Sequence, residues 1–271
     1  MVQIGYLKLL TFNFARKKLS LPNRKNILVI SGLDPSGGAG ISADIETIHS
    51  LNSRALPIIT TLTSQNTQNV SLVSSVDIEI IDSQLKSLMD DIRIDAIKLG
   101  LLADKNIMEY LSDFLDQYKN IPIVVDPILK SSSGKIFTNE NIISTYVEKI
   151  IPKAIIATPN REEFLEISRS DNFSDGLKNF RSKYTLVTSA EVKNETLTHI
   201  LFKKGNFVEE YKYKKLPHSY HGSGCTLASS LTSFYLKEKR MEKAVNLALN
   251  YTYNSLLNAE KIGKIQYHPV R

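Results

Sequence analysis

Two hydrophobic periods alternate along the chain. Short apolar runs rich in β-branched residues predict strands at 27–31, 55–63, 95–100, 121–126, 154–158 and 184–189. Longer segments, in which apolar residues recur every three or four positions, predict helices at 38–53, 77–93, 104–119, 139–150 and 160–168. Because the strands are apolar on both faces and alternate with helices, the pattern indicates an α/β fold with a doubly wound, mostly parallel sheet.

The last third of the chain departs from this alternation. Residues 198–204 and 207–213 alternate apolar and polar side chains around Gly205-Asn206, which predicts a hairpin near the end of the sheet. Two helices, at about 225–238 and 241–260, are then expected to close the chain. No linker or repeat interrupts residues 26–271, so we expect one domain over that range.

The basic residues are concentrated at the start of the chain. Residues 1–25 contain no Asp or Glu and six basic side chains, which equal the net charge of +6: Lys8, Arg16, Lys17, Lys18, Arg24 and Lys25. The remainder is therefore neutral, which argues against a nucleic-acid-binding face. We interpret residues 1–25 as a basic N-terminal extension, either a disordered tail or an organelle-targeting segment.

Cysteine content and hydropathy indicate the compartment in which the protein works. The single cysteine, Cys225, excludes an intrachain disulfide and fits a reducing compartment. No apolar run approaches the roughly 18 residues needed to span a bilayer. We therefore expect a soluble cytoplasmic protein without a membrane partner.

In open α/β sheets the ligand site lies beyond the carboxyl ends of the strands, so residues that follow strands are candidates. The first strand precedes the glycine-rich stretch 31–44, SGLDPSGGAGISAD. It lacks both the GxxxxGK[ST] pattern of a P-loop and the GxGxxG spacing of a dinucleotide site, and a tight turn would explain its glycines equally well. Asp44 favours a binding role, because its carboxylate could accept hydrogen bonds from a polar ligand.

Polar side chains also follow the later strands. Gln65 offers an acceptor and two donors, which suits a heterocycle with an amino group next to a ring nitrogen, although a surface turn would use similar residues. Asp126 ends the fourth strand, and Asn160 and Glu163 follow the fifth, one helical turn apart. These oxygen ligands suit Mg²⁺.

A glycine-rich stretch, HGSGC at 221–225, opens the penultimate helix. Its backbone N–H groups and the helix dipole would form an anion hole for a transferring phosphoryl group. Cys225 is then either a small packing residue or a base beside that hole. The dipole is expected to lower the pKa of the Cys225 thiol and favour the thiolate.

The chain resembles the ribokinase-like superfamily, and within it the hydroxymethylpyrimidine/phosphomethylpyrimidine kinases of thiamine biosynthesis. The resemblance runs from about residue 27 to 259 and rests on six motifs in order: SGLDPSGGAGISAD, SQNTQNV, DAIKLGLL, VVDPILKSSSG, ATPNREEF and HGSGCTL. It implies a three-layer α/β/α sandwich and a cytoplasmic homodimer. It also implies phosphorylation of 4-amino-5-hydroxymethyl-2-methylpyrimidine by ATP, to the monophosphate and on to the diphosphate.

The same resemblance implies roles for individual residues. The implied pyrimidine-binding residues are Gly32, Ala39, Asp44 and Gln65. The implied catalytic group comprises Gly222, Ser223 and Gly224 of the anion hole and Cys225 as the base. Contacts to ATP are implied for Asn160, Glu163 and Thr188, and contacts to Mg²⁺ for Asp126 and Glu163.

Three places depart from the family pattern. Residues 188–191, Thr-Ser-Ala-Glu, replace a lysine and two glycines, Lys130 stands at a usually apolar position, and Leu101 replaces a common methionine. The first two changes bear on nucleotide affinity and on the second phosphorylation. Two alternatives stay open: a pyridoxal or pyridoxine kinase, which Gln65 disfavours, and a catalytically weak pyrimidine-binding module, which the altered loop favours.

Overall fold

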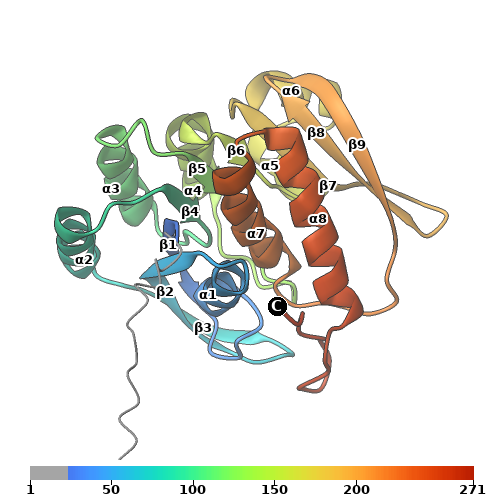
Figure 1. The fold of residues 1–271 in the computed structure, drawn as a ribbon, viewed down its shortest axis with the longest axis horizontal. Coiled ribbons are helices and arrows are strands. Elements are labelled where there is room, and N and C mark those ends of the chain that lie inside the picture. The colour runs from blue at the N-terminus through green and yellow to red at the C-terminus, as the bar shows by residue number, and fades with distance from the viewer. Residues whose placement is uncertain (1–23) are drawn as a thin grey trace, which may run out of the picture.

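The computed structural model describes residues 24–271, so the predicted extension lies, except for Arg24 and Lys25, outside the described residues. The described chain builds a nine-stranded sheet in the order β3-β2-β1-β4-β5-β6-β7-β8-β9 (Figure 1). The strands are β1 (Asn26–Leu33), β2 (Arg54–Gln65), β3 (Val70–Ser75), β4 (Ala96–Leu99), β5 (Ile123–Val125), β6 (Ile156–Ala157), β7 (Tyr184–Lys193), β8 (Thr196–Lys203) and β9 (Asn206–Lys214). The central strands pair in parallel, whereas β3, β8 and β9 pair antiparallel at the two edges.

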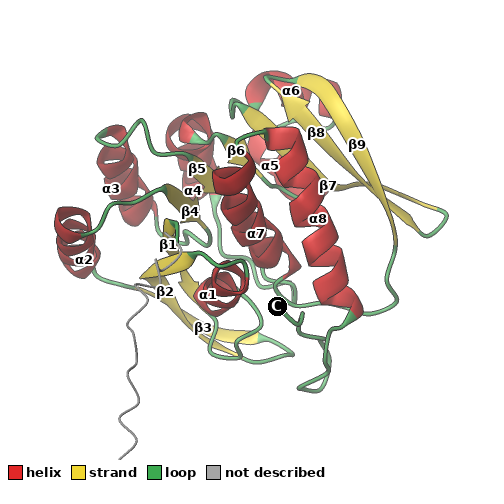
Figure 2. Ribbon diagram, viewed as in Figure 1, coloured by secondary structure: helices red, strands yellow, loops and turns green. Residues whose placement is uncertain are grey.

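Helices cover both faces of this sheet and give the predicted three layers (Figure 2). The helices α1 (Gly40–Ser50), α7 (Ser223–Glu238) and α8 (Met241–Leu257) pack together on one face. The other face carries α2 (Ile78–Asp91), α3 (Lys105–Asp116), α4 (Glu140–Thr145), α5 (Arg161–Ser168) and α6 (Phe173–Asn179). A π-helical turn (Tyr146–Ile150) and a 3-10 turn (Ile151–Lys153) continue α4.

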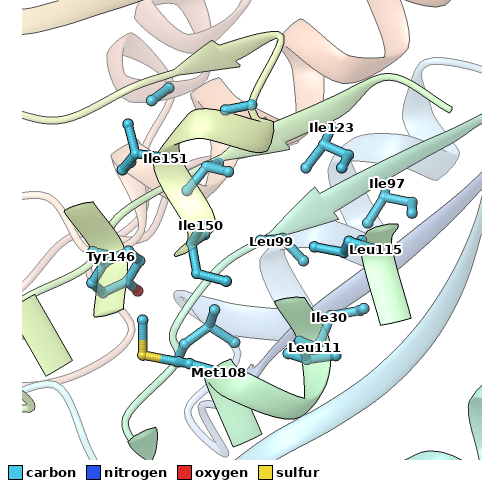
Figure 3. Packing of buried hydrophobic residues seen from close by; sticks show 14 of the residues in the cluster. Ile30, Ile97, Leu99, Met108, Leu111, Leu115, Ile123, Tyr146, Ile150 and Ile151 are labelled. Atoms are coloured by element: carbon cyan, nitrogen blue, oxygen red, sulfur yellow. The ribbon is translucent and has the colours of Figure 1, made fainter. Parts of the chain in front are cut away.

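The alternation of side chains along the buried strands explains their continuous apolar runs. Ile30 and Leu99 point to the face on which α3 supplies Met108, Leu111 and Leu115 (Figure 3). Residues of the opposite pleat, including Ile27 and Val29, pack against α1 and α7. Most core positions of the central strands are therefore apolar on both faces, although Ser31 and Lys98 are among the buried polar exceptions.

The structure also differs from the expected elements. The second strand was predicted to end at residue 63, but β2 continues to Gln65 and an antiparallel strand, β3, begins at Val70. The turn between them is short because the Asn66 side chain accepts the N–H groups of Gln68 and Asn69. Most of β3 is exposed, so it lacks the apolar run that predicts a buried strand.

At the other edge, the predicted hairpin is confirmed. Strands β8 and β9 pair antiparallel, and Gly205 in their turn has a φ of +78°, a left-handed conformation that favours glycine. The short helix α6 was not predicted. Within residues 24–271, no helix combines the length and the apolar character that crossing a membrane requires.

Candidate active site

A cavity of about 640 Å³ opens where the parallel strands end. The sequence-predicted residues that line it are Gly32, Ala39, Gln65, Asp126, Asn160, Glu163, Thr188, Gly222, Ser223, Gly224 and Cys225. They come from β1, β2 and β7, from the segments that follow β1, β5 and β6, and from the start of α7. The fold thus brings together residues that the sequence spreads over nearly 200 positions.

Asp44 does not line this cavity. Its side chain is fully buried, with both oxygens 2.9 Å from the Lys98 ammonium and one of them 2.6 Å from the Ser229 hydroxyl. Burial alone would lower the pKa of Lys98, but the charges of Asp44, Cys225 and Asp126 raise it, so the lysine remains charged. Direct contact between Asp44 and a ligand, expected from its place near the start of α1, is not what the structure shows.

Glycine is required where α7 begins. Gly222 caps the helix with a φ of +78°, and a Cβ there would lie 1.9 Å from the carbonyl oxygen of Gly38. This close approach joins the two glycine-rich segments of the site. No side chain caps the helix, so its first backbone N–H groups remain as donors beside the cavity.

Cys225 is a buried thiol rather than the expected thiolate. Burial raises its pKa to about 12; the positive charge of Lys98 opposes this rise, and the charges of Asp126 and Asp44 add to it. The prediction of a lowered pKa was therefore wrong for the ligand-free chain. A helix dipole contributes at most about 2 kcal/mol, whereas full burial shifts a pKa by up to about 3–5 units.

Two buried carboxylates line the site. Burial, with a smaller contribution from Asp44, raises the pKa of Asp126 to about 6, even though the positive charge of Lys98 and contacts with Cys225 and Thr158 lower it. Burial and then the charge of Asp126 raise the pKa of Glu163 to about 8. Such a pair is unstable when both members are ionised unless a cation lies between them.

Local structure positions Glu163. Asn160 is the N-cap of α5, and its side chain accepts the Glu163 N–H at 3.0 Å, while a Glu163 carboxylate oxygen accepts the Asn160 N–H at 2.9 Å. This capping box explains why the two residues are three positions apart. It also fixes the Glu163 carboxylate beside the cavity.

The altered segment 188–191 lies within β7, and its acidic side chain stays out of the site. Glu191 is exposed and does not line the cavity, whereas Thr188 and Ser189 do. Ser189 adopts a φ of +47°, a left-handed conformation that normally favours glycine. Its N–H donates to Nδ1 of His199 at 3.1 Å, which holds the backbone in this position.

Sequence reasoning missed several residues that hold the site together. His221 contacts Asp34, Gln65 and Ser132, and Arg271 donates to the carbonyl of Gly38 at 2.5 Å. His221 lies inside a motif that was recognised for its glycines and cysteine. Nothing local in the sequence marks Arg271, because its partners lie between 45 and 234 positions away.

A comparison with protein families agrees with this geometry. Residues 34–271 match the family model described as phosphomethylpyrimidine kinase. The chain belongs to the phosphomethylpyrimidine kinase family. Membership confirms the predicted family and the prediction that the protein is a kinase.

Curated relatives of this phosphomethylpyrimidine kinase family member include bacterial and plant proteins. The hydroxymethylpyrimidine/phosphomethylpyrimidine kinase of Aquifex aeolicus is 29% identical over 88% of the chain and 96% of its own length. The Escherichia coli protein of the same name is 28% identical over 88% of the chain and 93% of its own length. A rice protein, "Probable thiamine biosynthetic bifunctional enzyme, chloroplastic", is 30% identical over 88% of the chain, which spans only 45% of that relative.

Solved structures confirm the ribokinase-like fold. Phosphomethylpyrimidine kinase from Clostridium difficile superposes with a TM-score of 0.73 at 30% identity, covering 86% of this chain and all of that one. Pyridoxal kinase from Staphylococcus aureus, in complex with AMP-PCP and pyridoxal, has a TM-score of 0.81 at 22% identity, covering 91% and 93% of the two chains. At that identity the second likeness shows the fold alone.

Proposed function

We propose that this chain uses ATP to phosphorylate 4-amino-5-hydroxymethyl-2-methylpyrimidine, and then its monophosphate, in thiamine biosynthesis. One observation carries the proposal: an amide suited to an aminopyrimidine, a helix start suited to a phosphoryl group and a buried acidic pair all line one cavity. The names of the family and of its bacterial relatives support the same substrate. We also propose that the protein is cytoplasmic and forms a homodimer. Light scattering of the purified chain would test the dimer.

The cavity offers two ends for two substrates. Gly32, Ala39, Gln65 and Leu101 line the end next to β1 and β2, where we place the pyrimidine. The opposite end is lined by Thr188 and Ser189 and by side chains of β8, β9 and α8, where we place the nucleotide. The start of α7 lies between the two ends and would bind the transferring phosphoryl group.

The proton of the attacking hydroxyl group needs an acceptor. We assign this role to Cys225, which gives its own thiol proton to the Asp126 carboxylate as it takes the hydroxyl proton. The new bond joins the substrate oxygen to the γ-phosphorus of ATP, and the bond from that phosphorus to the bridging oxygen breaks, so ADP leaves with the electron pair. The N–H groups of α7 stabilise the charge on the transferring group.

Asp126 and Glu163 fit a magnesium ion. Oδ2 of Asp126 is buried without a hydrogen-bond partner among residues 24–271, and the charge of Asp126 raises the affinity of Glu163 for protons. The described residues contain no cluster of three or more metal-ligating His, Cys, Asp or Glu side chains. Two carboxylates completed by phosphate and water suit Mg²⁺, which when bound would neutralise phosphate charge.

The pKa of Glu163 predicts how Mg²⁺ stabilises the fold. Its folded value of about 8 exceeds the ordinary 4.5. The titration of this group therefore leaves the free energy of unfolding unchanged below pH 4.5 and lowers it as the pH rises from 4.5 through 8. We expect Mg²⁺ at about ten times its Kd to raise Tm by roughly 3–6 °C at pH 8. The increase should be smaller at pH 6, where protons compete for the site.

Calorimetry with and without Mg²⁺ at the two pH values measures this effect. Glu163→Gln is the matched control, because glutamine preserves the capping box without the charge. It should remove both the pH dependence and most of the Mg²⁺ effect. An equal Mg²⁺ effect in wild type and variant would exclude Glu163 as a ligand.

The proposed function has a direct test. Purified chain is incubated with ATP, Mg²⁺ and either the pyrimidine alcohol or its monophosphate, and ³¹P NMR follows product formation. We expect turnover of both acceptors. A folded chain that turns over neither would refute the proposal, and turnover of the alcohol alone would restrict it to the first step.

Pyridoxal kinase is the second candidate, because the sequence leaves that alternative open and the pyridoxal kinase of Staphylococcus aureus has the same fold. The ratio of kcat/KM for the pyrimidine alcohol to that for pyridoxal distinguishes the two. We expect the pyrimidine to be preferred by at least about tenfold, because Gln65 pairs with its amino group and ring nitrogen. A ratio below one would make pyridoxal the substrate.

A further inference from the structure

His221 connects four segments that line the cavity. Its side chain is buried, and Nε2 lies 2.7 Å from an oxygen of Asp34 and 2.8 Å from the amide nitrogen of Gln65. On the other side of the ring, Nδ1 lies 2.8 Å from the hydroxyl of Ser132. The steps proposed above for phosphoryl transfer do not use this residue.

Asp34 decides which nitrogen of His221 carries a proton. Burial alone would raise the pKa of Asp34, but hydrogen bonds from His221 and Ser36 hold it below its ordinary value. Its oxygens also accept the N–H groups of Ser36 and Ala39, each at 2.9 Å. An ionised carboxylate only accepts hydrogen bonds, so the short contact at 2.7 Å requires a proton on Nε2 of His221.

A proton on Nε2 in turn constrains the Gln65 amide. With its nitrogen toward His221, two N–H donors would face each other. On its other side, Thr63 has one hydroxyl proton, which it donates to the carbonyl of Leu33 at 2.8 Å, so it has none for the Gln65 oxygen at 3.4 Å. A half-turn of the amide exchanges oxygen and nitrogen. The oxygen then faces the Nε2 proton, which it shares with Asp34, and the nitrogen donates to the Thr63 hydroxyl oxygen.

We propose that His221 is a positioning residue. It keeps the side-chain oxygen of Gln65 facing the His221 ring and the amide nitrogen of Gln65 facing Thr63. The consequence rests on the proposed function. The substrate ring nitrogen accepts from the free amide N–H, and its amino group donates to the free lone pair of the amide oxygen. The order of these two groups fixes which way round the pyrimidine lies, and with it the direction of the hydroxymethyl group.

Two substitutions of His221 separate this role from simple packing. Glutamine places an amide N–H near the position of Nε2, whereas asparagine reaches only toward the side of Nδ1. The measurement is the ratio of kcat/KM for the aminopyrimidine alcohol to that for an analogue with hydrogen in place of the amino group. We expect His221→Gln to keep this ratio within about threefold and His221→Asn to lower it about tenfold, with KM for ATP unchanged.

His268 provides the matched control. Its ring centroid lies 5.6 Å from that of His221, it is similarly buried, and its Nε2 has no hydrogen-bond partner within the described part of the chain. His268→Asn should leave the ratio unchanged. Adding His221→Asn to Gln65→Ala should lower the ratio no further than Gln65→Ala alone, because both changes remove the same discrimination.

An unchanged ratio in His221→Asn, or an equal fall in His268→Asn, would overturn the proposal. If His221→Asn fails to fold, ¹⁵N NMR of the wild-type imidazole decides instead: a protonated Nε2 is expected, and an unprotonated Nε2 contradicts the proposal. Failure of the proposed function gives a different result. The wild-type chain would then turn over neither pyrimidine, while the NMR measurement would still report on His221 and Asp34.

Discussion

Replacing Cys225 by serine is expected to lower kcat by about 10²- to 10⁴-fold and to leave the KM for the pyrimidine within about threefold. Serine has nearly the same size, but its hydroxyl holds its proton far more tightly than a thiol does. Burial already raises the pKa of the Cys225 thiol to about 12, above the value of about 6 for Asp126, so passing the proton to Asp126 is already uphill and a hydroxyl makes it more so. A loss in kcat without a loss in binding marks a group that acts in the transition state.

Steady-state kinetics of Cys225→Ser measures this effect. Ser230→Ala is the control, because Ser230 is buried on the same helix, does not line the cavity and donates to the Leu227 carbonyl. Its kcat should match that of the wild type. A nearly normal kcat in Cys225→Ser would make Cys225 a packing residue.

Replacing Lys98 by methionine is expected to lower the free energy of unfolding by about 3–5 kcal/mol, the usual effect of removing one partner of a buried ion pair. The Lys98 and Asp44 side chains are both fully buried, so the variant leaves a carboxylate without a countercharge or water. Adding Asp44→Asn should restore much of the lost stability, because the double variant no longer buries a charge at this position.

Urea unfolding of the single and double variants measures these changes. Lys86→Met is the control, because Lys86 forms a comparably short pair with Asp82, at 2.8 Å, but is 71% exposed. It should change stability by less than about 1 kcal/mol. A loss in Lys98→Met no larger than in the control would mean that Asp44 is neutral in the folded chain.

Sequence patterns alone predicted most of the architecture, for a local reason. In β1, β4 and β5 the core positions are apolar except Ser31 and Lys98, and the helices between them repeat at helical spacing, so each element is predicted by its own residues. Parallel strands joined by helices place their carboxyl ends along one edge. The convergence of Gln65, Asp126, Asn160 and Cys225 therefore followed from the order of elements.

Elements with weak local patterns were less predictable. The exposed strand β3 and the seven-residue helix α6 bury few side chains, so neither has a clear hydrophobic period. The left-handed conformation of Ser189 was also hidden, since serine does not favour it. That backbone is held by a contact with His199 on the next strand.

By itself, the sequence determined which residues stand at the ends of the strands. Only the tertiary structure decided which of them face the cavity and in what charge state. Asp44 turns into the core because Lys98, 54 positions away, lies there, and Asp34 meets His221 across 187 positions. The thiol of Cys225 is protonated because surrounding elements exclude water from it, which outweighs the dipole of its own helix. Desolvation and partner choice depend on long-range contacts, and no local pattern of residues encodes those.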